Sequence, residues 1–300
     1  MDSGVKISRE TYADREIMSD DSTILFKPVL SDIRDYSVVD QVFNEFKPQV
    51  VFHAAAYKHV PMQEYFPWEA VKTNVYGTSN VSDISIKYDV DKFVLVSTDK
   101  AVKPVNVMGA TKRLAEIITQ NYNNLNNHTE FMAVRFGNVL GSSGSVLTIF
   151  KEQIKNGGPI TITDPDMERY FMSIPEASQL ILQAGSLGSG GEIFILDMGK
   201  TIKIMDLALE LIRLSGFESK EIPIEITGSR PGEKKIEELS LPSEKLDSTK
   251  HDKIFVLNNK EAIKEIESII FKIEELKVSS LKYNYNPNEV KSILSSILLE

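Results

Sequence analysis

The sequence contains no cysteine among its 300 residues, which excludes disulfides, thiolate nucleophiles and cysteine-ligated metal sites. A chain without cysteine fits a reducing compartment, so we expect a cytoplasmic protein. Long apolar runs are also missing. The longest, such as FVLV and EIFIL, are far shorter than the roughly 18 residues that span a bilayer, so no membrane segment is expected in this chain.

Positive charge is in deficit, with 34 Lys and Arg against 43 Asp and Glu and a net charge of -9. Such a chain repels phosphate backbones at long range, so nucleic acid is not expected as a partner. The 4 histidines show no metal-ligand spacing, and no metal site is predicted. A hydrophobic content of 42% is typical of a globular protein with a large core.

Short apolar runs alternate with helical patterns through the first half of the chain. Expected strands are ILFKPVL, VVFHAAA, FVLVS at 93–97 and FMAVRF at 131–136, and expected helices are 38–46, 67–87 and 109–122. Strands separated by helices predict a parallel sheet with right-handed crossovers. We therefore expect an α/β fold, a Rossmann-like doubly wound parallel sheet.

The second half of the chain is punctuated by glycine and proline, which indicates shorter elements. We expect residues 1–140 to form a cofactor domain and residues 141–250 to form a smaller C-terminal substrate lobe, part of which returns to the core. Residues 251–300 are expected to be a helical tail. In this tail, 261–277 carries isoleucine and leucine at helical spacing, typical of an amphipathic helix that packs on the body.

A polar cluster directly follows the apolar run FVLV. Ser97, Thr98, Asp99 and Lys100 would lie at the carboxyl end of a parallel strand, where reactive groups of such folds gather. On its own the cluster is equally typical of a turn that caps the strand. The combination is more informative, because Met108 and Lys112 follow at a spacing of four, which places both side chains on one face of a helix.

With this cluster, the sequence resembles a known family. Short-chain dehydrogenases carry Ser or Thr after this strand and Tyr-x-x-x-Lys on the next helix, and TDKA with MGATK is similar to the extended-superfamily nucleotide-sugar 4,6-dehydratases that act on UDP-N-acetylglucosamine in polysaccharide and glycan biosynthesis. The resemblance runs from about residue 29 to 238. Its other blocks are HAAAYKHVP (53–61), TNVYGT (73–78), RFGNVLGSSGSV (135–146), ERYFMSIPEA (168–177) and GSRPGEK (228–234).

The resemblance implies a reaction and roles for four residues. In the family, NAD or NADP takes a hydride from carbon 4 of the sugar, water is eliminated across carbons 5 and 6, and the hydride returns to carbon 6. By resemblance, Lys100 is the base at carbon 5 and Asp99 the acid at the carbon 6 hydroxyl. Thr98 would donate to the carbon 4 oxygen, and Lys112 would hold the nicotinamide ribose. Homo-oligomers are also implied.

Met108 stands where most of the superfamily has tyrosine, and a thioether cannot transfer a proton. Some members of this dehydratase group also carry methionine here, so the substitution supports the subgroup. Removal of the carbon 4 hydroxyl proton would then fall to Asp99 or to a water near Lys112. The alternative is that Met108 is an ordinary core residue of a helix.

The resemblance also implies binding residues. Those for the cofactor are Asp32, Ile33, Ala54, Ala55, Ala56, Lys58, Asn74, Ser97 and Lys112; those for the nucleotide sugar are Lys58, His59, Asn138, Arg169, Arg230 and Glu233. Guanidinium groups suit diphosphate oxygens. Taken singly, each of these residues is equally typical of a surface turn or a packing contact.

The glycine-rich turn that binds the pyrophosphate in this family has no counterpart here, because Gly4 is the only glycine before Gly77. We expect an N-terminally incomplete Rossmann-like domain with an exposed sheet edge or a partner that completes it, and weakened or lost cofactor binding. A non-catalytic nucleotide-sugar-binding or subunit-like protein is therefore the main alternative to the dehydratase. A sugar 4-epimerase is less favoured, because epimerases depend on the tyrosine and lack the Asp99-Lys100 pair.

Overall fold

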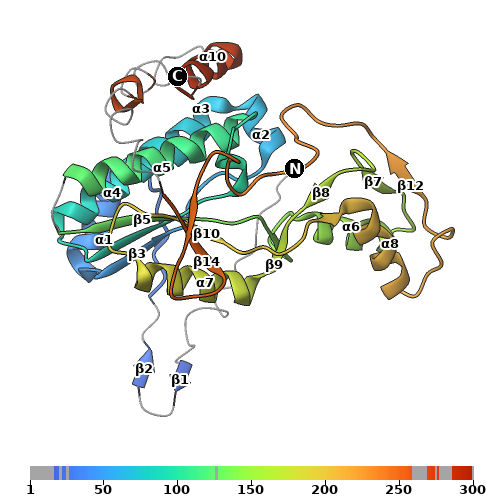
Figure 1. Cartoon of the computed structure of the whole chain (residues 1–300), viewed down its shortest axis with the longest axis horizontal. Coiled ribbons are helices and arrows are strands. Elements are labelled where there is room, and N and C mark those ends of the chain that lie inside the picture. Colours follow the sequence, from blue (N-terminus) through green and yellow to red (C-terminus); the bar gives the residue numbers. More distant parts are fainter. Residues whose placement is uncertain are drawn as a thin grey trace.

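The structure is a computed structural model that describes residues 17–19, 22–24, 27–125, 128–258, 269–273, 276 and 286–298. A central sheet carries helices on both faces, and a smaller lobe extends from one side of it (Figure 1). None of the helices in these ranges combines the length and apolar character that crossing a membrane requires.

The central sheet has six strands in the order β13-β14-β10-β5-β4-β3. Four are parallel: β3 (Val50–His53), β4 (Lys92–Val96), β5 (Glu130–Arg135) and β10 (Ile193–Leu196). Strand β14 (Ile254–Leu257) pairs antiparallel with β10, and β13 (Leu246–Ser248) pairs antiparallel with β14 at the edge of the sheet. The middle residues of β4 and all four of β10 are buried, which is why these strands read as continuous apolar runs.

Helices cover both faces of this sheet. Helices α1 (Tyr36–Phe46), α4 (Gly77–Lys87) and α5 (Val107–Leu125) belong to the side whose core includes Phe93 and Phe131. Helix α7 (Ile174–Leu187) covers the other side, where Val94 and Met132 point. The alternation of strand side chains thus divides one apolar run between two cores. This arrangement confirms the expected Rossmann-like α/β fold.

The helical stretch predicted at 67–87 is continuous but changes type along its length. It begins as α3 (Pro67–Ala70), continues as the π-helix η2 (Val71–Tyr76) and ends as α4. The short helix α2 (Val60–Tyr65) precedes it. π-Helical segments are rare and are frequently found at functional sites, and η2 carries Asn74.

The smaller lobe has its own core, formed by α6 (Val146–Lys155), α8 (Ile204–Leu214) and β7 (Ile160–Ile162), which pairs in parallel with β12 (Ile224–Ile226). Two short pairings complete it: β8 (Glu168–Arg169) with β11 (Ile202–Lys203), and β6 (Asn138–Leu140) with β9 (Phe171–Ser173). β6 follows β5 almost directly, so the chain enters the lobe from the carboxyl end of β5.

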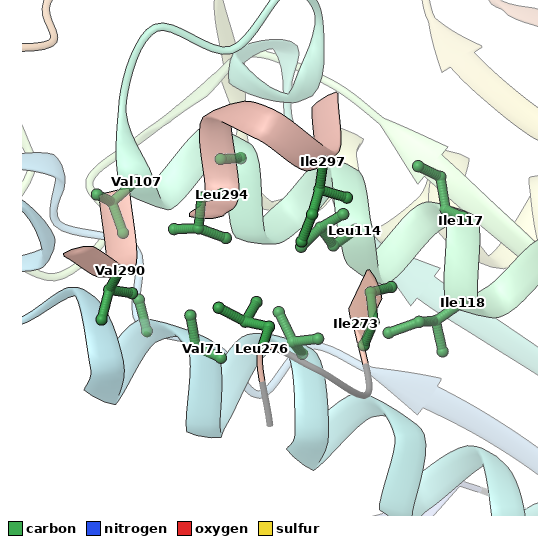
Figure 2. Packing of buried hydrophobic residues seen from close by; sticks show 13 residues of the cluster. Val71, Val107, Leu114, Ile117, Ile118, Ile273, Leu276, Val290, Leu294 and Ile297 are labelled. Atoms are coloured by element: carbon green, nitrogen blue, oxygen red, sulfur yellow. The ribbon is translucent and has the colours of Figure 1, made fainter. Parts of the chain in front are cut away.

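The C-terminal residues form a helical layer over α5 (Figure 2). Leu294 and Ile297 of α10 (Pro287–Leu298) and Ile273 pack against a cluster that includes Val107 and Leu114 of α5. Residues 269–273 are helical, as expected for the amphipathic stretch 261–277, but most of that stretch lies outside the described residues.

Two sequence-based predictions require correction. ILFKPVL is not a strand of the central sheet: β2 (Ser22–Ile24) pairs with β1 (Ile17–Ser19) in a separate hairpin, and 27–30 form no strand. Pro28 cannot donate to a ladder, and Leu30 is fully exposed. Residues 254–257, expected within a helical tail, are strand β14, since Ile, Phe and Val suit a strand that pairs with β10. The division into domains stays a prediction.

The expected exposed edge is found at β3 within the described chain. β3 pairs with β4 on one side only, and Val50 and Phe52 are 45% and 42% exposed. Apolar side chains at an unpaired strand are unusual for a monomer surface, because such edges favour pairing with another chain.

Candidate active site

A cavity of about 420 Å³ opens at the carboxyl ends of β3, β4 and β5. This is the edge of a parallel sheet at which ligands bind in open α/β folds. Ten of the residues predicted to act on cofactor or substrate line it: Ala54, Ala56, Lys58, His59, Ser97, Thr98, Lys100, Met108, Lys112 and Asn138. Tertiary structure thus brings together residues that are up to 84 positions apart in the chain.

The turn after β4 assembles Thr98, Asp99 and Lys100 into one hydrogen-bonded group. It is the 3-10 helix η3 (Asp99–Ala101), and its N-cap Thr98 accepts a hydrogen bond from the Lys100 backbone N–H. The Thr98 hydroxyl donates to Asp99 Oδ1 at 2.8 Å, and Lys100 Nζ donates to the same oxygen at 2.9 Å. Lys100 Nζ also donates to Asn138 Oδ1 at 3.2 Å. A carboxyl group and an amine therefore lie in direct contact beside the cavity.

Asp99 is fully buried, and only its Oδ1 is engaged by donors. Its Oδ2 has no hydrogen-bond partner among the described residues. An unpartnered carboxyl oxygen in a buried position is costly. Oδ2 is therefore the oxygen of this group that remains available for a further hydrogen bond.

Helix α5 presents Met108 and Lys112 to the cavity, one turn apart. The helix lies close to η3 because Gly109 has no side chain, and a Cβ there would collide with the Lys100 carbonyl. Lys112 Nζ donates to the Val96 carbonyl at the end of β4. Burial lowers the pKa of Lys112 to about 8, although the nearby Glu116 carboxylate opposes this fall.

A buried ionic network that the sequence analysis missed lies beneath the cavity. The Arg135 guanidinium donates to both carboxylate oxygens of Glu116 at 2.8 Å, and the Ser97 hydroxyl donates to Glu116 Oε1 at 2.6 Å. Burial opposes ionisation of Glu116, but the charges and hydrogen bonds of Arg135, Arg113 and Ser97 outweigh it and hold the pKa at about 2. One signal was available, since Arg135 ends an otherwise apolar strand and such a charge needs a buried partner.

Asn74 lies beside the cavity and joins its walls. Its side chain accepts from the Tyr57 N–H at 2.7 Å, donates to the Tyr57 carbonyl, and donates to the Thr111 hydroxyl on α5 at 3.0 Å. The loop after β3 is thereby tied to the helix that carries Met108 and Lys112. The structure gives Asn74 this bridging position; its predicted part in cofactor binding stays a prediction.

His59 contributes to the opposite wall of the cavity. Its ring lies over Gly144, where a Cβ would come within 2.7 Å of the ring and where the backbone has a φ of +65°, which favours glycine. Burial, with the neighbouring Lys58, lowers the pKa of His59. The close contact gives a physical reason for a glycine in the block 135–146.

The remaining predicted binding residues do not line this cavity: Asp32, Ile33, Ala55, Asn74, Arg169, Arg230 and Glu233. Asp32 is exposed and forms an ion pair with Arg34, and Ile33 packs on Gly77. Arg230 is exposed, and its backbone N–H donates to the Glu233 carboxylate.

Arg169 is buried and already engaged by the protein. Its guanidinium donates to the backbone carbonyls of Glu168, Lys234 and Lys235. These bonds fasten the segment after Arg230 to strand β8. The predicted contacts of Arg169 and Arg230 with a diphosphate therefore stay predictions, because neither guanidinium points into the cavity as the structure stands.

The described residues fit one end of a dinucleotide. Lys112, Ser97 and the small side chains of Ala54 and Ala56 suit a ribose and a flat ring within the cavity. A pyrophosphate needs free N–H groups at a helix start. At the first described α-helix, α1, the N-cap carboxylate of Asp35 already accepts from the Ser37 and Val38 N–H groups, and its charge would repel phosphate. The start of α1 therefore does not offer free N–H groups to the pyrophosphate of a dinucleotide.

Comparison with known proteins places these features in a family context. The model of the family described as "Polysaccharide biosynthesis protein" matches residues 5–259. The capsular polysaccharide biosynthesis protein CapD of Staphylococcus aureus is 56% identical over 77% of this chain, and the match covers 39% of CapD. The chain thus spans about two fifths of the length of this relative. A UDP-glucose 4-epimerase of Rickettsia canadensis is 43% identical over 70% of this chain and 60% of its own length.

Solved structures agree on the fold. Pen from Bacillus thuringiensis is 39% identical, with a TM-score of 0.71 over 76% of this chain and 72% of Pen. The dTDP-glucose 4,6-dehydratase DesIV from Streptomyces venezuelae, solved with NAD bound, has a TM-score of 0.64 over 70% of this chain and 69% of DesIV. At 19% identity, the likeness to DesIV shows the fold alone.

Proposed function

The chain belongs to the polysaccharide biosynthesis protein family, and we propose that it carries the active site of an NAD(P)-dependent nucleotide-sugar 4,6-dehydratase. The proposed substrate is UDP-N-acetylglucosamine and the product UDP-4-keto-6-deoxy-N-acetylhexosamine, which makes the enzyme a lyase of polysaccharide or glycan biosynthesis. A cytoplasmic location and a homo-oligomer remain predictions.

One observation carries the proposal: Lys100, which lines the cavity together with Lys112, is hydrogen-bonded to the fully buried carboxyl group of Asp99. Elimination of water across two carbons requires a base and an acid within reach of adjacent atoms. Lys100 Nζ, 2.9 Å from Asp99 Oδ1, meets this requirement. A plain strand-capping turn would not need the carboxyl group to be fully buried, as Asp99 is.

The residues divide the proposed chemistry as follows. Thr98 donates to the carbon 4 oxygen. When bound, a nicotinamide supplies the acceptor for the carbon 4 hydride and returns that hydride to carbon 6. The neutral amine of Lys100 takes the proton from carbon 5, and the pair of electrons released forms the double bond between carbons 5 and 6. The carbon 6 hydroxyl leaves as water with the proton from Asp99, and when the hydride is added to carbon 6 the Lys100 ammonium gives a proton back to carbon 5.

Met108 leaves the carbon 4 hydroxyl proton without the usual tyrosine acceptor. Lys112 is the alternative that the geometry favours, because an amine with a pKa of about 8 exchanges protons near neutral pH, directly or through a water. Replacing Met108 with tyrosine tests this assignment. A large gain in turnover would mean that the native site lacks its own base.

The decisive experiment incubates the chain with UDP-N-acetylglucosamine and either NAD+ or NADP+ and analyses the sugar by mass spectrometry. We expect a product lighter by one water, and a loss of about 100-fold or more in Lys100→Met. Lys103→Met is the matched control, since Lys103 is the next lysine along the chain and is exposed away from the cavity. Its activity should equal that of the wild type.

Two other outcomes identify the competing functions. Binding of the nucleotide sugar without any change in it, measured by calorimetry in parallel, would support a non-catalytic binding or subunit-like protein. This alternative is favoured by the lack of a pyrophosphate cradle at α1. A product of unchanged mass with inverted carbon 4, identified by NMR, would support a 4-epimerase, in line with the similarity to the Rickettsia protein.

A further inference from the structure

The segment 228–239 crosses from the lobe to the back of the candidate active site. It is anchored at three places: Asn106 donates to the Gly232 carbonyl, Lys234 donates to the Val102 carbonyl, and Arg169 donates to the carbonyls of 234 and 235. Two of these anchors lie on the chain that directly follows Lys100. The segment is therefore held in a fixed place relative to the Asp99-Lys100 pair.

This anchoring brings one further carboxyl group to the pair. Glu237 is 3% exposed, and its Oε1 lies 4.0 Å from Lys100 Nζ. Asp99 Oδ1 contacts the same amine at 2.9 Å, and Asn138 Oδ1 contacts it at 3.2 Å. Glu237 does not line the cavity. It faces the amine without being in the place where a substrate would lie.

The charges around Glu237 and Lys100 come from several elements. Burial raises the pKa of Glu237 and the Asp99 charge adds to this, while Lys100, Arg169 and Lys234 oppose it. The groups that face Lys100 are Asp99 on its own turn, the neutral Asn138 on β6, and Glu237. The Lys100 ammonium thus faces two buried carboxyl groups, Asp99 at 2.9 Å and Glu237 at 4.0 Å, and the charge of each acts on it.

We propose that Glu237 is a positioning residue that sets the proton affinity of Lys100 and holds its amine between Asp99 and Asn138. The role of this cluster in dehydration rests on the proposed function, whereas the electrostatic coupling can be measured without turnover. As Lys100 takes the carbon 5 proton it gains a positive charge, and a Glu237 carboxylate at this distance stabilises the ammonium that forms.

The coupling is tested by labelling lysine amines with acetic anhydride at a series of pH values and measuring the modification of Lys100 by mass spectrometry. Only the neutral amine reacts, so the pH at which the labelling rate of Lys100 is half-maximal reports its proton affinity. We call this pH the Lys100 midpoint. In Glu237→Gln the carboxylate is lost, and we expect the midpoint to fall by about one pH unit. Below the midpoint, this corresponds to about tenfold faster labelling of Lys100.

The matched control is Glu238→Gln, because Glu238 is the next residue on the same segment and lies 4.0 Å from Lys234 rather than at Lys100. Its Lys100 midpoint should equal that of the wild type. If Glu237→Gln does not fold, Glu237→Asp carries the test, since the shortened side chain withdraws its charge from the amine and should also lower the midpoint. An unchanged or raised Lys100 midpoint in the folded variant overturns the proposal.

Turnover separates this inference from the proposed function. If the wild type dehydrates the sugar, the acidic limb of the kcat profile should move to lower pH in Glu237→Gln while KM for the sugar stays within about twofold. A shifted limb together with a shifted labelling midpoint supports both statements. If the wild-type chain leaves the sugar unchanged but Glu237→Gln still lowers the Lys100 midpoint, the coupling is supported and the dehydratase function is refuted.

Discussion

Replacing Lys112 with methionine should stabilise the folded protein at neutral pH, although Lys112 lies in the candidate active site. Burial lowers the pKa of Lys112 from its ordinary 10.5 to about 8. At about 1.4 kcal/mol for each tenfold change in proton affinity, keeping this amine charged in the folded state costs roughly 3 kcal/mol. Methionine has a similar length and no charge, so it removes this cost.

The same substitution also removes one hydrogen bond. Lys112 Nζ donates to the Val96 carbonyl, and its loss should cost about 1 kcal/mol. The net gain in the free energy of unfolding is therefore about 2 kcal/mol at pH 7. Urea unfolding followed by circular dichroism measures this quantity, provided that the slope with denaturant is the same in both proteins.

The pH dependence gives the prediction its sign. Between pH 8 and 10.5, the unfolded chain binds the Lys112 proton and the folded chain does not, so wild-type stability gains from this group as pH rises through that window. The advantage of Lys112→Met should therefore disappear at about pH 10.5. Lys151→Met, at an exposed position of α6, is the control and should stay within about 0.5 kcal/mol at both pH values. The reasoning would be refuted if Lys112→Met were less stable than the wild type at pH 7, or if the difference in their free energies of unfolding did not change with pH.

Four further substitutions test other contacts of the structure. Arg135→Met should cost about 3–5 kcal/mol, measured by urea unfolding, because it leaves Glu116 buried without its main cation. In the wild type, the pKa of Glu116 is held at about 2, below its ordinary 4.5. Its contribution to the free energy of unfolding is therefore complete above pH 4.5 and should be lost as the pH falls towards 2. Glu116→Gln should flatten this part of the acid-unfolding curve. Gly109→Ala should destabilise the fold by about 1–3 kcal/mol and move Lys100, visible as altered labelling of its amine, because the new Cβ collides with the Lys100 carbonyl. Leu294→Ala should cost about 2–5 kcal/mol if α10 is part of the cooperative unit, and a loss below 1 kcal/mol would mean that α10 unfolds separately.

The central part of the fold was predictable because its signals are local. The apolar runs at 93–97 and 131–136 became β4 and β5, and the patterns at 38–46 and 109–122 became α1 and α5. The prediction of a sheet strand at ILFKPVL was wrong, because an apolar run becomes a strand of a sheet only when a neighbouring strand pairs with it. The prediction of helix at 254–257 was also wrong, because the sequence of a short apolar run beside a helical pattern does not show whether the run is helix or strand.

The candidate site was predictable where its residues follow one strand or share one helix face. Ser97 to Lys100 come directly after β4, and Met108 and Lys112 lie one turn apart, so local geometry alone places them. Resemblance to a family extended this to Asn138 and His59, which the cavity includes. The resemblance did not predict the position of Arg169 correctly enough to place it in the cavity, because its guanidinium donates hydrogen bonds to the backbone carbonyls of Glu168 and Lys234.

The sequence by itself determined the core elements α1, β4, α5 and β5, the absence of thiol chemistry, and the cluster of Thr98, Asp99 and Lys100 at a strand end. Only the tertiary structure decided that Glu116 and Arg135 pair beneath that cluster and that Glu237 reaches Lys100 from 137 residues away. The physical reason is range. Hydrophobic period and turn chemistry act between neighbours in the chain, whereas the partners of a buried charge are selected by packing between segments that the sequence keeps far apart.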